Sequence, residues 1–239
     1  NVLGFDIQQR IERFTTGGTV TYSPLANLTN RLTIGYDFSQ QENRNLRPFG
    51  FRQRPKGALL NNTWQKRLLT FDYVSSYIVD VADALRTTFS WGGQAVGDEM
   101  RALEGWGEDY PGAAEPTVSS ASLRIAEESR QRVWNAGFFF QNVLDISNKY
   151  FVTTGVRVDG NSAFGEGFGL QVYPKASLSW VVSDEGFFPE SLGQVKLRTA
   201  YGQSGRAPGA FDAVRTWSPV GWGGVPAFVP QNVGNPDLG

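Results

Sequence analysis

The chain contains neither histidine nor cysteine among its 239 residues. Without cysteine it has no disulfides, thiol nucleophiles or thiolate metal ligands. Without histidine it has neither the common imidazole ligand of zinc sites nor a Ser-His or Cys-His catalytic pair. Only carboxylate, lysine or tyrosine chemistry remains for catalysis, so we expect no enzyme activity and no cofactor.

Long apolar runs and an excess of one charge are also missing. The stretch Gly137–Phe140 is among the longest apolar runs, far short of the roughly 18 residues that a membrane-spanning helix needs. The strands of a β-barrel would escape this test, because alternate residues face the lumen. Lysine and arginine total 22 against 23 for aspartate and glutamate, a net charge of -1. That balance argues against a nucleic-acid partner.

Aromatic residues make up 13% of the chain and glycines number 28, a mixture typical of β-structure with open loops. Segments in which apolar and polar residues alternate recur along almost the whole length and predict about eight strands in an antiparallel up-and-down meander. The predicted strands are residues 13–22, 28–39, 69–77, 85–91, 127–144, 150–161, 172–183 and 195–203.

The predicted connections alternate between short and long. In a meander this places the short turns at one end of the sheet and the long loops at the other, as in outer-membrane barrels. A soluble sandwich or propeller also has alternating strands, but several segments reach the roughly 9 to 11 residues that cross a bilayer. Aromatic residues near the segment ends fit an interfacial girdle. They include Tyr22, Tyr36, Phe38, Tyr73, Tyr77, Phe89, Trp91, Tyr150, Phe151, Phe187 and Phe188.

Four charged residues lie on the polar faces of predicted strands, namely Arg157, Asp159, Lys196 and Arg198. In a barrel these side chains face the lumen, where opposite charges on neighbouring strands can pair. The glycine-rich stretch 164–169 precedes another strand and not a helix, which favours a flexible hairpin loop over a phosphate-binding loop.

Two long connections carry the candidate ligand or partner contacts. The loop predicted over residues 93–125 holds Trp106 and Tyr110, and flat aromatic rings among acids suit polar ligands with apolar faces. Its acids could also serve a glycosidase, although a solvated loop is the commoner role. They are Asp98, Glu99, Glu104, Glu108 and Asp109. The loop predicted over residues 40–59 is basic, with Arg47 and Arg52 as the candidate contacts for a partner or for anionic lipid headgroups.

A series of motifs appears in one order along the second half of the chain. It reads RVDGNSAFG from Arg157, YPKASLSW from Tyr173, SDEGFF from Ser183, KLRTAYGQSG from Lys196, and finally NPDL from Asn235 to Leu238. This order resembles the barrel region of TonB-dependent outer-membrane transporters of the SusC/RagA family. The resemblance is specific from about residue 150 to 239, whereas residues 2–144 agree in strand rhythm and loop placement.

The resemblance implies an outer-membrane barrel of about 22 strands in a Gram-negative bacterium, with an N-terminal plug domain. It also implies energisation through the TonB complex, a SusD-like lipoprotein partner and import of oligosaccharides or peptides. We expect residues 1–239 to be a partial barrel domain, an open arc of about eight strands truncated at both ends and lacking the plug and the TonB box. Alternatives are a TonB-dependent siderophore or vitamin receptor and a soluble carbohydrate-binding module.

Overall fold

The computed structural model describes residues 4–164, 170–205 and 209–235. Its regular structure in these ranges consists of strands and short 3-10 turns, and none of its helices is long and apolar enough to span a membrane. The strands are β1 (Asp6–Leu25), β2 (Leu28–Arg47), β3 (Ala58–Ala82), β4 (Leu85–Glu108), β5 (Leu123–Ile146), β6 (Tyr150–Asn161), β7 (Gln171–Val181), β8 (Lys196–Gly202), β9 (Thr216–Trp222) and β10 (Val225–Asn232).

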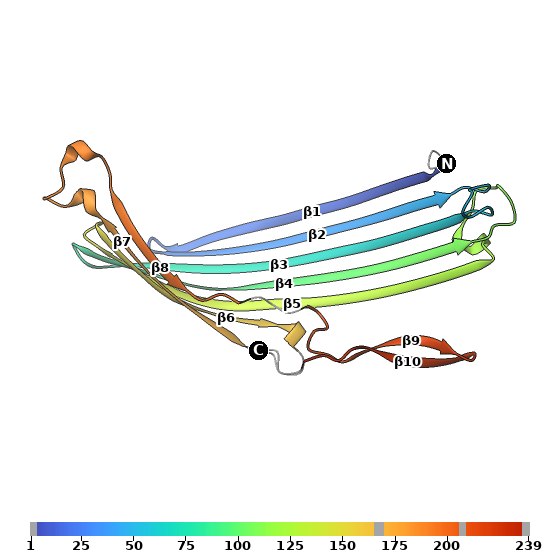
Figure 1. Ribbon diagram of the computed structural model, residues 1–239. Coiled ribbons are helices and arrows are strands. Elements are labelled where there is room, and N and C mark those ends of the chain that lie inside the picture. Colours follow the sequence, from blue (N-terminus) through green and yellow to red (C-terminus); the bar gives the residue numbers. More distant parts are fainter. Residues whose placement is uncertain (1–3, 165–169, 206–208, 236–239) are drawn as a thin grey trace. The chain divides into compact units, whose positions relative to one another are not determined.

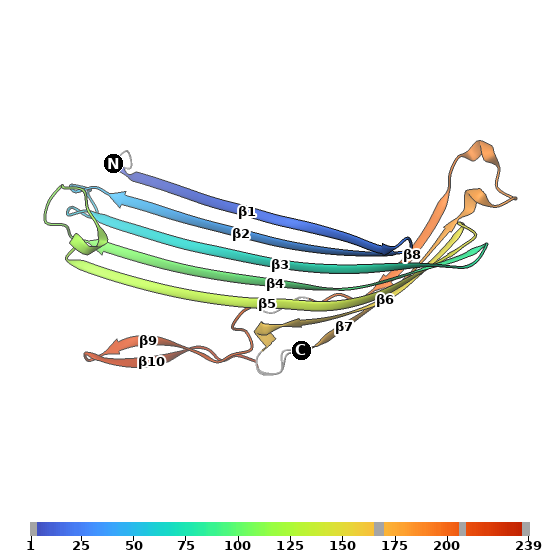
Figure 2. The ribbon, with the colours of Figure 1, turned by 180° about the vertical axis from the view of Figure 1, so that it is seen from behind.

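Strands β1 to β8 form one sheet in which neighbours in sequence are neighbours in space (Figure 1, and from behind in Figure 2). The predicted eight-stranded meander is thereby confirmed. Its tight turns follow β1, β3 and β5. In the turn after β5, Ser147 and Asn148 have φ values of 57° and 56°, and Asp145 Oδ1 accepts a hydrogen bond from the Asn148 amide at 2.9 Å. Left-handed residues at both central positions match the right-handed twist of a hairpin.

Strands β9 and β10 form a separate two-stranded sheet that is not predicted from the sequence. Gly223 and Gly224 connect the two strands with φ values of 57° and 83°, again the geometry of a tight hairpin turn. Pro219, Pro226 and Pro230 interrupt the segment. Proline has no N–H to donate to a strand ladder, so three prolines argue against a strand in the sequence. An edge strand nevertheless tolerates them.

The chain divides into two compact units, each described here by itself. Unit 1 comprises residues 1–17, 35–69 and 97–132, and unit 2 comprises residues 18–34, 70–96 and 133–239. Unit 1 thus holds one end of each of β1 to β5 and the two loops between them. Unit 2 holds the tight turns and the strands from β6 onward.

The sheet of unit 2 has one apolar and one polar face, because successive side chains of a strand point to opposite sides. On the apolar face Phe140 lies opposite Val156, and Val152 lies opposite Leu178. Many of these side chains are exposed, among them Phe138, Phe140, Val156, Val172, Leu178, Leu197 and Tyr201. The polar face carries Arg157, Asp159, Tyr173, Lys175, Lys196 and Arg198.

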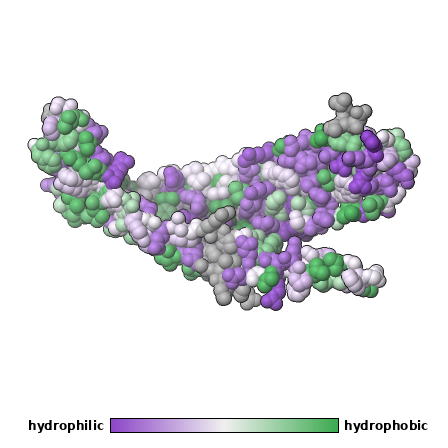
Figure 3. Space-filling view, in the orientation of Figure 1, coloured by the Kyte–Doolittle hydropathy of each residue, from purple (hydrophilic) through white to green (hydrophobic). Residues whose placement is uncertain are grey.

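In unit 1 the strands continue well beyond their predicted ends, and hydrophilic residues cover this part of β1 to β5 (Figure 3). The predicted loops are therefore wrong for Asp98, Glu99, Glu104, Trp106 and Glu108, which lie in β4, and for Arg47, which is the last residue of β2. Here polar residues lie on both faces, with only scattered apolar ones such as Met100 and Leu103, so the alternation on which the prediction depends ends while the backbone ladder goes on. Polar pairs replace apolar ones across the strands, such as Lys66 with Asp98 at 3.0 Å and Asn62 with Glu104 at 3.2 Å.

The connection from β4 to β5 packs back against the sheet and forms the small apolar core of unit 1. Tyr110 and Ala121 are buried there with Leu59, and Leu46 and Val118 pack against them. Glycine in β4 makes this approach possible. A Cβ atom on Gly107 would lie 2.6 Å from Tyr110 Oη and 3.0 Å from Ala121 Cβ, so no other residue fits there unless the connection moves.

At the tight-turn end of unit 2, Glu185 binds three side chains, those of Lys149 in the β5–β6 turn, Tyr150 in β6 and Trp180 in β7. Glu185 Oε1 accepts hydrogen bonds from Tyr150 Oη at 2.7 Å and from Trp180 Nε1 at 3.2 Å, and Oε2 accepts one from Lys149 Nζ at 3.3 Å. The Tyr150 and Trp180 rings stack with centroids 6.1 Å apart. The hydrogen bond from Tyr150, followed by that from Trp180, lowers the pKa of the Glu185 carboxyl.

This pKa shift predicts an acid-dependent loss of stability. Because the carboxyl pKa is lower in the folded than in the unfolded chain, its contribution is complete above the unfolded value and is lost as the pH falls through the folded value. We expect Glu185→Gln to flatten the decline in thermal unfolding midpoint of the full-length protein between about pH 6 and pH 3. Asp184→Asn, in the same turn, serves as the control and should keep the wild-type decline. An unchanged decline in Glu185→Gln would contradict the prediction.

Candidate functional site

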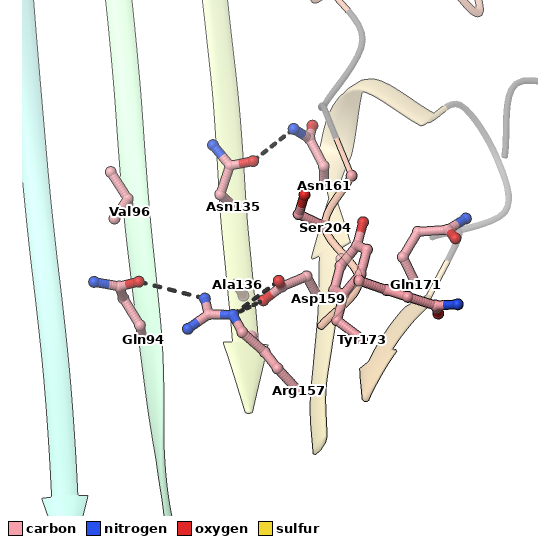
Figure 4. A pocket seen from close by; sticks show the side chains of 14 residues that line it. Gln94, Val96, Asn135, Ala136, Arg157, Asp159, Asn161, Gln171, Tyr173 and Ser204 are labelled. Atoms are coloured by element: carbon pink, nitrogen blue, oxygen red, sulfur yellow. Dashed lines mark hydrogen bonds and ion pairs between the residues drawn. The ribbon is translucent and has the colours of Figure 1, made fainter. Parts of the chain in front are cut away.

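A polar recess of about 320 Å³ opens on the polar face of unit 2 (Figure 4). Strands β4 to β7 and the segment after β8 each contribute to its lining, because the meander brings alternate residues of successive strands to the same side. Its polar lining residues are Gln94, Asn135, Arg157, Asp159, Asn161, Gln171, Tyr173, Gln203 and Ser204.

Arg157 is the centre of this recess. Its Nε donates to both carboxylate oxygens of Asp159, at 2.7 and 2.8 Å, and its Nη2 donates to Gln94 Oε1 at 3.4 Å (Figure 4). Gln94 in turn donates to Asp72 Oδ2 at 3.3 Å. A Cβ atom on Gly137 would overlap Asp159 Oδ1 and lie 2.9 Å from Arg157 Nη2. The missing side chain of Gly137 therefore makes the space that the ion pair occupies.

Two amides and a phenol complete the recess. Asn161 Nδ2 donates to Asn135 Oδ1 at 2.5 Å, and Asn161 Oδ1 accepts from the Ala163 amide at 2.7 Å. The ring of Tyr173 lies against Gly205, where a Cβ atom would overlap its hydroxyl. No group of three or more metal-ligating side chains occurs in the described ranges. The recess thus offers fixed donors and acceptors that suit recognition of a polar ligand.

The four predicted lumen-facing charges all lie on the polar face of unit 2. Their pairing differs from the expectation, because Arg157 bonds Asp159 two residues along β6 and not a charge on a neighbouring strand. Residues two apart on a strand share a face, so this pairing needs no second strand. Lys196 instead places its Nζ 4.7 Å from the centroid of the Phe151 ring. Arg198 is exposed and lies opposite Ser179.

Among the predicted ligand contacts of unit 1, Arg47 and Trp106 come together. The Arg47 guanidinium lies 5.6 Å from the centroid of the Trp106 ring, a cation–π geometry. Trp106 Nε1 donates to Glu108 Oε2 at 3.3 Å, and the other oxygen of Glu108 pairs with Arg54. This cluster of half-exposed aromatic and charged groups keeps Trp106 a candidate for contact with a polar ligand.

Tyr110 and Arg52 stand apart from that cluster. The expectation that Tyr110 is exposed is wrong, since only 4% of the residue is accessible. Its ring fills the core beneath the β4–β5 connection, and burial raises the pKa of its hydroxyl. Arg52 is exposed in the turn between β2 and β3. The predicted glycine-rich hairpin loop and the final motif residues Asp237 and Leu238 lie outside the described residues.

Sequence reasoning did not single out Gln94, Asn135, Asn161 or Tyr173 as residues of one site. Polar side chains on strands are common, and β4 lies far from β6 and β7 in the sequence. One signal was available. Arg157, Asp159 and Asn161 follow one another at alternate positions of β6, which places three polar groups on one face.

The chain is similar to known proteins in both sequence and fold. The family model described as "TonB dependent receptor-like, beta-barrel" matches residues 3–239. Two curated relatives come from Formosa agariphila. TonB-dependent receptor P26 is 28% identical over 211 residues, covering 82% of this chain and 21% of the relative. TonB-dependent receptor P39 is 36% identical over 100 residues, covering 40% of this chain and 10% of the relative.

Solved structures share the fold at lower identity. The structure titled "Structure of the RagAB peptide transporter" superimposes with a TM-score of 0.92 at 16% identity, covering 99% of this chain and 27% of that one. The RagAB peptide importer in the "open-open" state gives a TM-score of 0.86 at 16% identity, covering 100% of this chain and 27% of that one. The chain thus spans about a quarter of these structures and about a fifth or less of the curated relatives.

A test of the recess is the replacement Gly137→Ala in the full-length protein. The added methyl group would overlap Asp159 and push Arg157 aside, and overpacking of this kind costs about 1 to 3 kcal/mol. We expect a lower unfolding midpoint in detergent, read from the heat-dependent shift in electrophoretic mobility. Gly202→Ala is the matched control, because a Cβ atom there meets its neighbour at an ordinary 3.8 Å. Equal midpoints for the two variants would show that the ion pair does not depend on Gly137.

Proposed function

Because the chain belongs to the TonB-dependent receptor-like β-barrel family, we propose that it forms part of the wall of an outer-membrane transporter for peptides or oligosaccharides. In this proposal the parent protein is energised through TonB and works with a SusD-like lipoprotein. The observation that carries the proposal is the likeness of 99% of the chain to a RagAB peptide transporter, with a TM-score of 0.92.

The chemistry of the apolar face supports contact with lipid. Exposed valine, leucine and phenylalanine side chains cover this face across β5 to β7. Several polar side chains on the same side of β2 to β5 are paired with one another. Asn142 Nδ2 donates to Thr87 Oγ1 at 2.6 Å, and Asn30 Oδ1 accepts from the Tyr73 and Ser75 hydroxyls at 2.9 Å each. An unpaired polar group costs several kcal/mol in hydrocarbon, so such pairing suits a surface that faces lipid.

The polar face supports a hydrophilic cargo. The recess around Arg157 presents guanidinium, carboxylate, amide and phenol groups on one side of the sheet, and these groups complement the amides of peptides and the hydroxyls of sugars. The cluster of Arg47, Trp106 and Glu108 adds an aromatic surface with a donor and an acceptor. In the proposed barrel both sets lie along the path of the cargo.

The membrane part of the proposal is tested by placing a charge on each face of the same strand. Leu178 lies on the apolar face of β7, and Ser177 lies beside it on the polar face. We expect Leu178→Lys to lower the free energy of unfolding in a bilayer by about 2 to 4 kcal/mol if the residue is near the midplane, with Ser177→Lys close to wild type. The measurement is a denaturant titration of the full-length protein in liposomes. Equal costs for the two variants would mean that the apolar face does not meet lipid.

The transport part is tested by uptake of labelled oligopeptides and oligosaccharides into cells that carry the full-length protein. We expect Trp106→Ala to raise the KM for the accepted cargo about tenfold, since loss of one aromatic contact costs about 1 to 2 kcal/mol. Trp134→Ala, on the apolar face of β5, is the control and should leave the KM unchanged. Uptake of ferric siderophores or vitamin B12, with no uptake of either polymer, would overturn the assignment of cargo.

A further inference from the structure

Arginines gather on one side of the sheet in unit 1, just beyond the last apolar residues. Phe38 and Leu69 end the apolar stretches of β2 and β3 on this side, and Arg67 follows Leu69 by two residues. The Arg67 guanidinium lies 5.9 Å from the centroid of the Phe38 ring. Arg67 therefore stands at the edge of the apolar surface, with its charged end beside the outermost aromatic ring.

Strands β4 and β5 add three more arginines on the same side. Lys66 pairs with Asp98 at 3.0 Å on one face of the sheet. Their neighbours in sequence, Arg67 and Glu99, therefore point to the other face, which carries Phe38. Glu99 bonds Arg101 at 2.6 Å and Arg132 at 3.0 Å. The patch that we call the arginine patch consists of Arg67, Arg101, Arg130 and Arg132 together with Glu99 and Glu128.

The arginine patch has surplus positive charge and free hydrogen-bond donors. Four arginines face two glutamates, a local net charge of +2 in a chain whose total is -1. Glu99 lies beneath its partners with 18% of its side chain accessible, while Arg101 and Arg132 expose 47% and 64% of theirs. Each guanidinium has five N–H donors. Arg101 and Arg132 share the Glu99 carboxylate, and Arg130 pairs with Glu128 at 2.5 Å, so most of these donors remain available to an outside acceptor.

The height of the patch matches that of lipid headgroups. Two residues along a strand correspond to about 7 Å, which is the distance from Leu69 to Arg67 along β3. The headgroup layer on each side of a bilayer is about 5 to 8 Å thick. If Leu69 ends the lipid-facing stretch, Arg67 lies at the level of the headgroup phosphates, with Arg132 near the same level because it pairs with Glu99. Arginine recognises phosphate with paired, charge-assisted hydrogen bonds.

We propose that the arginine patch binds the phosphorylated headgroups of lipids in the outer leaflet of the membrane around the barrel. This inference rests on the proposed membrane function, because it needs the adjoining apolar surface to be embedded. The occupant is a lipid and not free phosphate, since the patch adjoins Phe38 and Leu69, where acyl chains meet the protein. Glu99 holds Arg101 and Arg132 in place and also limits the affinity of the patch, because it repels the phosphate that they attract.

The test uses the full-length protein in phosphatidylcholine nanodiscs that contain either diphosphoryl lipid A or its dephosphorylated form. Native mass spectrometry counts the lipid A molecules retained when the disc is removed. We expect the wild type to retain the phosphorylated form and the double variant Arg67→Gln/Arg132→Gln to retain about tenfold less. The control is Lys66→Gln, which removes a positive charge at the same height on the opposite face and should retain lipid as the wild type does.

A second variant separates binding from a purely structural role. Glu99→Gln removes the competing carboxylate, so it should increase retention of the phosphorylated lipid, whereas loss of a structural ion pair alone would leave retention unchanged. Equal retention of phosphorylated and dephosphorylated lipid A, or full displacement by millimolar inorganic phosphate, would overturn the proposal. Insertion into the nanodisc is scored separately by heat-dependent mobility. Failure to insert would count against the membrane function, and insertion without phosphate preference would count against the arginine patch alone.

Discussion

Backbone hydrogen bonding between neighbouring strands is the constraint on which this structure depends. Strands β1 to β5 are each 20 or more residues long, although only part of each carries alternating apolar residues. The ladder satisfies every paired amide and carbonyl whatever the side chains are, so it can continue from an apolar region into one where most side chains are polar. The side chains along one strand can therefore change from apolar ones in unit 2 to ion-paired ones in unit 1.

Glycines in the strands leave space for other side chains to pack against the sheet. Gly137 leaves space for the Arg157–Asp159 pair on the polar face, and Gly107 leaves space for Tyr110 and Ala121 beneath the β4–β5 connection. Gly155 in β6 likewise leaves space for the Lys175 side chain, since a Cβ atom there would lie 2.8 Å from Lys175 Cε. The recess and the packed connection therefore have the same local cause, a missing Cβ atom in a strand whose neighbours bear functional groups.

The sequence predicted the strands best where their two faces differ. The limits of β6 and β8 agree with the alternation within about two residues, as expected when one face is apolar and the other polar. The alternation predicts that β4 ends near Trp91, whereas the strand continues to Glu108. Polar residues on both faces of this last part leave no periodic signal. Burial of Tyr110 could not be predicted either, since it depends on a connection folding back over Gly107. The arginine patch could not be predicted either, because its residues belong to three strands and the register of these strands is not evident from the sequence.

In the proposed barrel, one face of this sheet meets lipid and the other meets water. This part of the protein contains no cysteine, so a cysteine introduced along β5 is the only labelling site within it. In the full-length protein in liposomes, labels at Phe138 and Phe140 should collide with oxygen and be shielded from a water-soluble nickel reagent, while labels at Phe139 and Gln141 should show the reverse. An alternating pattern of this kind is the predicted result. Equal access of the nickel reagent to all four positions would mean that the apolar face does not meet lipid.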